Sequence, residues 1–139
     1  MKRVVVTGVG AIALAGIGFS QLGQLLKIGG VAVAIKQFGP QMNSAINRIS
    51  NHKDTYATTT KVVPILTVGI GASHAIGGAQ IMGPRNKVDQ VVAVAQPDAE
   101  LFGHEVRVKA LIPVSSKDVI QDIKRVDGVG VSGIVDIKL

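Results

Sequence analysis

The stretch VVPILTVGIGASHAIGGAQIMGP, residues 62–84, contains no Asp, Glu, Lys or Arg, and its interpretation decides the fold. Its length is sufficient for a membrane crossing. Pro64, His74 and Gln80 count against a crossing, because polar groups without partners are costly in lipid. Residues 62–70 are rich in β-branched and aliphatic side chains, which are typical of a buried strand. We therefore expect a buried strand here, with a second membrane crossing as the alternative.

The residues that follow this stretch predict a small α+β domain. The expected elements, in chain order, are a helix or strand between Pro84 and Pro97, a strand over 105–113, a helix over 115–126 and a strand over 129–139. A serine cap and the basic residues Lys124 and Arg125 mark the ends of the predicted helix. Gly133 indicates a β-bulge in the last strand. This order predicts a two-layer α+β sandwich with its helices on one face.

Toward the N-terminus, residues 4–26 form another uncharged run, which follows Lys2 and Arg3. A helix of that length spans roughly 34 Å, enough for the hydrocarbon core of a bilayer. We expect an apolar helix that lies in a membrane or in the core of an oligomer. A signal peptide cleaved near 13–15 and a soluble strand and helix are the alternatives. Four glycines are candidate positions of close helix packing, namely Gly8, Gly10, Gly16 and Gly18.

An amphipathic helix is expected over residues 40–51, because apolar residues recur there at helical spacing after Gly39 and Pro40. Such a helix either packs on the domain or lies on a membrane surface. The candidate membrane-contact residues are Lys2, Arg3, Phe38, Met42, Ile46 and Ile49. The polar residues 51–60 are typical of a linker. The chain therefore divides into an apolar segment (1–36), an amphipathic helix with linker (37–60) and an α+β domain (61–139).

The net charge of +6 lies entirely in residues 1–61, which hold seven basic residues and the single acidic residue Asp54. This asymmetry indicates that the basic part meets an anionic surface. Nucleic acid is an unlikely partner, because the aromatic residues that would stack on bases are nearly absent. A lipid bilayer or further copies of the chain are the expected partners, and Lys2 and Arg3 favour a cytoplasmic N-terminus.

Motifs for catalysis and for cofactors are weak. The absence of cysteine excludes thiolate metal sites and cysteine nucleophiles. The histidines His52, His74 and His104 lack metal-ligand spacing, so no metal is expected. The glycine pattern of residues 8–13 fits a dinucleotide turn, but no acidic residue precedes Asp54 to hold a ribose, so no cofactor is expected either.

These observations together predict a non-enzymatic, membrane-associated structural or assembly protein, whose C-terminal α+β domain mediates protein interaction or oligomerisation. A subunit of a virion or filament is one version of this prediction. A soluble binding protein for a lipid or another apolar ligand is the first alternative. A small enzyme that uses His74, or the loop 98–105 with Asp98 and Glu105 at its ends, is the second.

Overall fold

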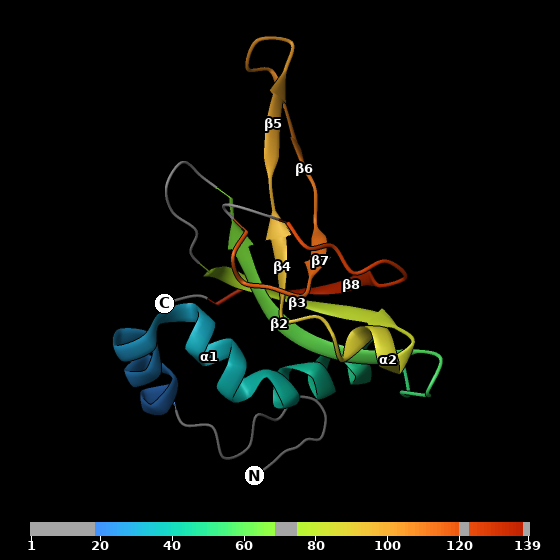
Figure 1. Cartoon of the computed structure of the whole chain (residues 1–139). Coiled ribbons are helices and arrows are strands. Elements are labelled where there is room, and N and C mark those ends of the chain that lie inside the picture. The colour runs from blue at the N-terminus through green and yellow to red at the C-terminus, as the bar shows by residue number, and fades with distance from the viewer. Residues whose placement is uncertain (1–18, 69–74, 120–122, 138–139) are drawn as a thin grey trace.

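The computed structural model describes residues 19–68, 75–119 and 123–137, with side chains described from residue 30 onward. The elements, in chain order, are α1 (Phe19–Ile49), β2 (Thr59–Thr67), β3 (Ala75–Gly83), α2 (Arg85–Val88), β4 (Ala93–Gln96), β5 (Asp98–Leu101), β6 (Val106–Lys109), β7 (Ile112–Val114) and β8 (Gly130–Val135). Figure 1 shows α1 running along one side of the sheet, while β5 and β6 extend away from it. The α+β class expected from the sequence is confirmed.

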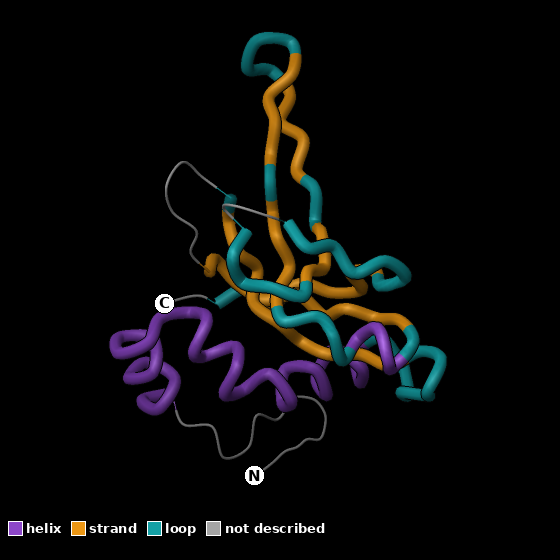
Figure 2. The backbone as a smooth tube through the Cα atoms, viewed as in Figure 1, coloured by secondary structure: helices purple, strands orange, loops and turns teal. Residues whose placement is uncertain are grey.

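The main sheet has five strands in the order β7-β4-β2-β3-β8. Strands β2 and β3 pair antiparallel across residues 59–83, and β2 pairs parallel with β4. The outer strands β7 and β8 both pair antiparallel with their neighbours. Figure 2 shows how these strands gather above α1. The buried strand expected at the start of 62–84 is confirmed, and the second half of that stretch forms its antiparallel partner.

The sheet is covered on both of its faces near β2. Val63 and Ile65 belong to one buried cluster, together with Ile81 of β3 and Val88 of α2. Leu66 belongs to a second buried cluster, which contains Ala93, Ala95, Val114 and Val119. Because successive residues of a strand point to opposite faces, two clusters on one strand place apolar layers on both sides. The unbroken apolar sequence of residues 62–66 in β2 follows from this double burial.

The helix α1 packs on β2 and β3. The backbone departs from helical geometry at Gly30, with φ 77° and ψ −169°. Gly78 lies so close to Ile35 that an added Cβ would stand 2.7 Å from its Cδ1 atom. The amphipathic helix expected over 40–51 is helical as far as Ile49, but the helix begins earlier, and Pro40 lies inside it rather than in its first turn.

The helix predicted over 115–126 is wrong in the described residues, whereas the segment between Pro84 and Pro97, expected as a helix or a strand, contains both. Between Pro84 and Pro97 the chain forms the short helix α2, a connection over residues 89–92, and the strand β4. The residues 115–119 and 123–126 are not helical. Residues 124–126 lie beside the end of β7 instead, where the Ser115 N–H donates to the Lys124 carbonyl (3.0 Å) and the Val126 N–H donates to the Pro113 carbonyl (2.9 Å). These strand-like bonds stand in place of the predicted helix, and Val119 is buried in the cluster with Leu66 and Val114.

The strands near the C-terminus were predicted more accurately. The strand expected over 105–113 is present as β6 and the start of β7, with a break at residues 110–111. The last expected strand is β8. Its register against β3 shifts where Gln80 faces Gly133 and Ile81 faces Val131, so Ser132 is the additional residue of a bulge. The bulge indicated by Gly133 is therefore confirmed.

No helix in the described part of the chain combines the length and the hydropathy that a membrane crossing needs. Most of the apolar run 4–26 lies outside the described residues, as do Lys2 and Arg3. The four glycines marked for helix packing also lie outside them: Gly8, Gly10, Gly16 and Gly18. The membrane or oligomer-core helix therefore has no support from the described residues and stays a prediction, as does the division into three parts.

Candidate functional site

The hairpin formed by β5 and β6, which we call the arm (residues 98–109), projects from the main sheet (Figure 1). It continues the β4 and β7 pair, and the Ala110 N–H donates to the Pro97 carbonyl at the junction (3.0 Å). Every residue from 98 to 111 is exposed. The arm is thus oriented by its continuity with β4 and β7, and no other element of the described chain packs against it.

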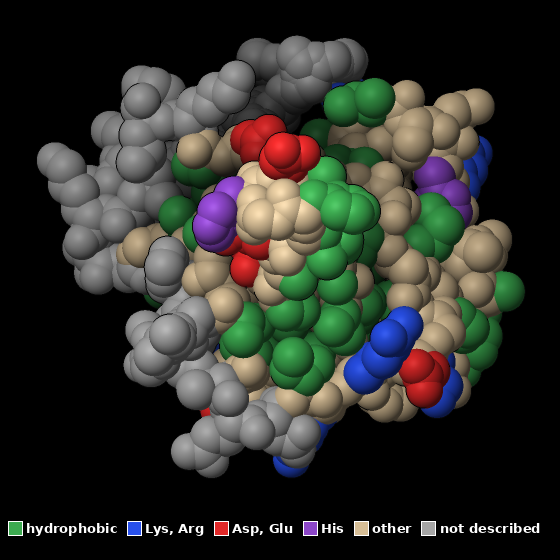
Figure 3. Space-filling view, turned by 90° about the horizontal axis from the view of Figure 1, so that it is seen from above, with side chains coloured by type: hydrophobic (Ala, Val, Ile, Leu, Met, Phe, Trp, Pro, Cys, Tyr) green, Lys and Arg blue, Asp and Glu red, His purple; other side chains and the backbone are tan. Residues whose placement is uncertain are grey.

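The cross-strand pairs divide the arm into two chemically different faces. Asp98 pairs with Lys109 and Glu100 pairs with Arg107, which places opposite charges side by side on one face. The alternate pairs are Ala99 with Val108 and Leu101 with Val106, and they form an apolar face. Leu101, Val106 and Val108 are 46%, 40% and 49% exposed. Figure 3, in which the arm points toward the viewer, shows hydrophobic side chains gathered at this end of the molecule.

The tip of the arm presents an aromatic ring from an unfavourable backbone conformation. Phe102 has φ 54° and is followed by Gly103 with φ 76°. A left-handed conformation costs roughly 1–2 kcal/mol for a residue with a side chain, and a bulky residue rarely adopts it. The Phe102 side chain is nevertheless 78% exposed, so packing within the described chain does not explain why the strain is kept. Strain of this kind is typical of functional positions.

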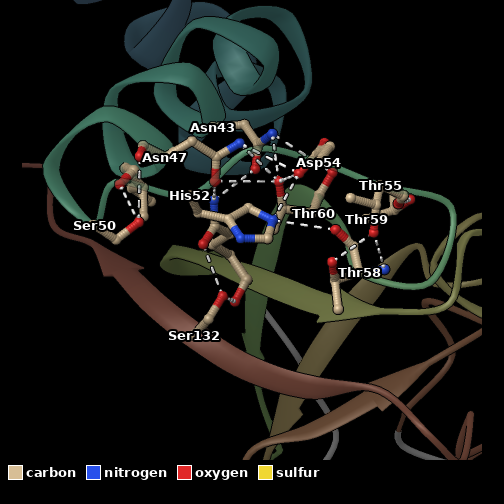
Figure 4. A network of polar contacts seen from close by, with 12 residues as sticks. Asn43, Asn47, Ser50, His52, Asp54, Thr55, Thr58, Thr59, Thr60 and Ser132 are labelled. Carbon is tan, nitrogen blue, oxygen red and sulfur yellow. Dashed lines mark hydrogen bonds and ion pairs between the residues drawn. The ribbon is translucent and has the colours of Figure 1, made fainter.

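A polar network lies between α1 and the sheet (Figure 4). At its centre is Gln80, which is 1% exposed. The Gln80 amide donates to the side-chain oxygens of Asn43 (2.9 Å) and Asn47 (2.7 Å), and it accepts from the Ser132 hydroxyl (2.7 Å). Because both amide hydrogens and the amide oxygen have partners, the desolvation cost of burying Gln80 is offset. The network therefore fixes α1 to β3 and β8.

The network continues toward solvent through Thr60. Its hydroxyl accepts from the amides of Asn43 (3.0 Å) and Asn47 (2.9 Å) and lies 2.7 Å from a carboxylate oxygen of Asp54. The same Asp54 oxygen lies 3.1 Å from Nε2 of His52. A histidine, a carboxylate and a hydroxyl in this order invite a catalytic interpretation. The hydroxyl hydrogen of Thr60 is directed at Asp54 rather than at the histidine, and Thr60 is buried, so the geometry favours a structural role.

The candidate residues from the sequence are dispersed in the structure. Phe38, Met42 and Ile46 of α1 are half-buried, and Ile46 lies against Gly133 of β8, whereas Ile49 is 86% exposed. His74 lies outside the described residues. Asp98 and Glu105 lie on the exposed arm rather than in a concave pocket. Within the described ranges no group of histidine and acidic residues is arranged to hold a metal ion.

Sequence reasoning missed the two faces of the arm and the polar network. The alternation in Glu105–Lys109 identified a strand, and extending the comparison to Asp98–Leu101 would have shown matching charged and apolar positions. Asn43 and Asn47 are four residues apart, which places both on one helix face. Comparisons with protein-family models, with curated proteins and with solved structures found no match to this chain. The site is therefore interpreted from its own geometry.

Proposed function

We propose that this chain is a non-enzymatic structural protein that assembles with further copies of itself through the apolar face of the arm. The observation that carries the proposal is the row formed by Ala99, Leu101, Val106 and Val108, which the described chain leaves uncovered. An isolated two-stranded hairpin is marginally stable in water, and covering its apolar face stabilises it. A partner that supplies this cover would therefore be favoured.

A second copy of the chain is a suitable partner because it carries the same apolar face. Two arms that meet face to face in a twofold arrangement would bury both rows at once. The opposite face, with Asp98, Glu100, Arg107 and Lys109, would remain in solvent. Exposed apolar surface flanked by charged residues is typical of interaction sites. The arm thus has the character of an assembly element, which agrees with the structural role expected from the sequence.

Substitutions on the two faces of one strand test this proposal. The double substitution Val106→Thr and Val108→Thr keeps β-branched side chains but places hydroxyls on the apolar face. The matched control, Arg107→Thr and Lys109→Thr, changes the other face of the same strand. We expect sedimentation equilibrium to show self-association of the unmodified chain, at least tenfold weakening by the valine substitutions, and a smaller change in the control. A monomer at all concentrations, or equal effects of both variants, would contradict the proposal.

Attachment to a bilayer through the apolar run 4–26 is the second part of the proposal, and it rests on the sequence alone. Its test is alkaline carbonate extraction of membranes from cells that produce the full chain. We expect the chain to stay with the membranes and the variant Leu14→Arg to be released, because a charge at the centre of a spanning helix is costly. The control Gln90→Arg adds the same charge at an exposed position and should stay. Release of the unmodified chain would refute the attachment.

The enzymatic alternative, with His74 or the residues 98–105, stays a prediction of the sequence.

A further inference from the structure

A cleft of about 490 Å³ lies beside α1, and none of its lining residues belongs to the arm. Ala32, Gly39 and Pro40 of α1 form part of its wall, and residues 60–64 of β2 line it as well. Val92, which precedes β4, adds a further apolar side chain. The volume falls within the roughly 300–1,000 Å³ that is usual for small-molecule sites, which are mostly apolar with a few placed polar groups.

Three lysines line this cleft, and they come from three separate segments: Lys36 from α1, Lys61 from β2 and Lys117 from the connection after β7. None of the described lining residues is acidic. None of the three lysines forms an ion pair with a carboxylate of the described chain. Lys61 is held in place because its ammonium donates to the Val91 carbonyl (2.8 Å), and an ammonium has further hydrogens to donate. The cleft therefore combines apolar walls with uncompensated positive charge.

We propose that this cleft binds a single-chain anionic amphiphile, such as a fatty acid, with its carboxylate between the lysines and its alkyl chain along the apolar wall. Neither part of the ligand would suffice alone. A small anion would leave the apolar wall in water, and an uncharged chain would leave the lysines without a counter-charge. The proposal does not depend on assembly through the arm, since the two surfaces share no residue.

Isothermal titration calorimetry of the full chain tests the ligand class. We expect decanoate to bind at concentrations below its micelle formation. Each methylene that becomes buried should tighten binding by about fourfold, so dodecanoate should bind more tightly than octanoate. Decanol, acetate and decyltrimethylammonium are the comparison ligands, and all three should bind at least tenfold more weakly. Equal binding of decanol or of the cationic amphiphile would overturn the proposal.

Substitutions test the place of binding. Lys36 and Lys117 are exposed, so Lys36→Gln with Lys117→Gln should leave the fold intact. We expect this pair to weaken decanoate binding about tenfold, since each exposed ion pair contributes modestly. The matched pair Lys53→Gln with Lys109→Gln removes two exposed lysines outside the cleft and should leave binding unchanged. Equal loss in both pairs would show a nonspecific charge effect and overturn the site.

The lysines could also contact anionic headgroups on the surface of a bilayer. A vesicle experiment distinguishes such a surface contact from the binding of a single amphiphile in the cleft. The full chain is titrated with vesicles of phosphatidylcholine and phosphatidylserine before and after saturation with decanoate. We expect decanoate to bind in the absence of vesicles. If the chain bound only to vesicles and not to monomeric decanoate, the cleft proposal would be refuted in favour of a surface contact.

Discussion

The two antiparallel hairpins of this protein, β2–β3 and the arm, differ in what covers them. The β2–β3 hairpin is buried on both faces along most of its length, whereas every residue of the arm is exposed. Their sequences differ in the same sense, since residues 62–66 of β2 are all apolar and the strands of the arm alternate apolar with charged residues. Both hairpins have the same antiparallel backbone pairing. The pattern of their apolar side chains differs, and it indicates on how many faces each hairpin packs against other elements.

The comparison also concerns polar groups. The buried hairpin contains Gln80, and its hydrogen bonds are supplied by Asn43 and Asn47 of α1 and by Ser132 of β8. The arm exposes its charges to solvent, as in the pair of Arg107 with Asp98 at 3.8 Å. Exposed pairs of this kind contribute little to stability. The core hairpin therefore depends on tertiary contacts, while the arm depends on its continuity with β4 and β7.

Substitution of one apolar residue in each hairpin should give the largest difference in stability between the two hairpins. Ile81 is fully buried, so Ile81→Ala should lower the free energy of unfolding by about 2–5 kcal/mol through lost burial and a cavity. Val108→Ala in the arm should change it by no more than about 0.5 kcal/mol. Urea denaturation followed by circular dichroism measures both. The protein must be dilute enough to be monomeric, because association adds to apparent stability. A large effect of Val108→Ala in the monomer would show that the arm is covered within the chain.

The sequence predictions also differ in outcome between the buried β2–β3 hairpin and the segments whose structure depends on tertiary contacts. The apolar run 62–84 predicted one buried strand because residues 62–70 are rich in β-branched and aliphatic side chains, and it did not predict that the second half of the run forms the antiparallel partner β3. The alternation in residues 105–113 predicted a strand but could not show that the arm lacks a covering layer, because burial is a property of the tertiary structure. The predicted helix over 115–126 failed because Val119, Ile123 and Val126 recur at helical spacing, yet the described residues 115–119 and 123–126 are not helical and these three side chains pack in the two apolar clusters. Pairing with β7 overrode the local preference.

The candidate sites were less predictable than the fold. Asn43 and Asn47 are recognisable as one polar stripe of a helix, but Gln80 lies 37 residues beyond Asn43, and only the packing of α1 on β3 joins them. The lysine cleft is also formed by residues far apart in the sequence, because Lys36, Lys61 and Lys117 belong to segments that no local pattern connects. Each site is assembled by long-range contacts, so a single sequence does not reveal it.

Replacement of the buried glutamine should have an intermediate effect. Gln80→Met has a similar size but removes the hydrogen bonds that the Gln80 amide forms with Asn43, Asn47 and Ser132. We expect a loss of about 1–3 kcal/mol in the free energy of unfolding. The matched control Gln90→Met removes an exposed glutamine that bonds only the Asn86 carbonyl among the described contacts, and should be neutral within about 0.5 kcal/mol. Equal effects in thermal denaturation would contradict a central role for the network.

No loss of stability is expected from substitution at the tip of the arm. Phe102→Asn places a residue that tolerates the left-handed conformation at φ 54°, so the free energy of unfolding should stay equal or rise by up to about 1 kcal/mol. Self-association should nevertheless weaken, because the exposed ring that is lost directly follows Leu101 of the apolar row that we propose to meet another copy. The control Tyr56→Asn removes a different exposed ring, outside the arm, and should leave association unchanged.

Opposite changes in stability and association would separate the two roles of Phe102. Amide hydrogen exchange of residues 98–109 reports the stability of the hairpin, and sedimentation equilibrium reports association. In the β2–β3 hairpin a substitution that removes an apolar side chain should weaken folding. At Phe102 the same kind of substitution should spare folding and weaken assembly, because its side chain contributes to contacts made after the chain has folded. If association were unchanged, the tip would lie outside the contact, and only the row of Ala99, Leu101, Val106 and Val108 would remain as the proposed interface.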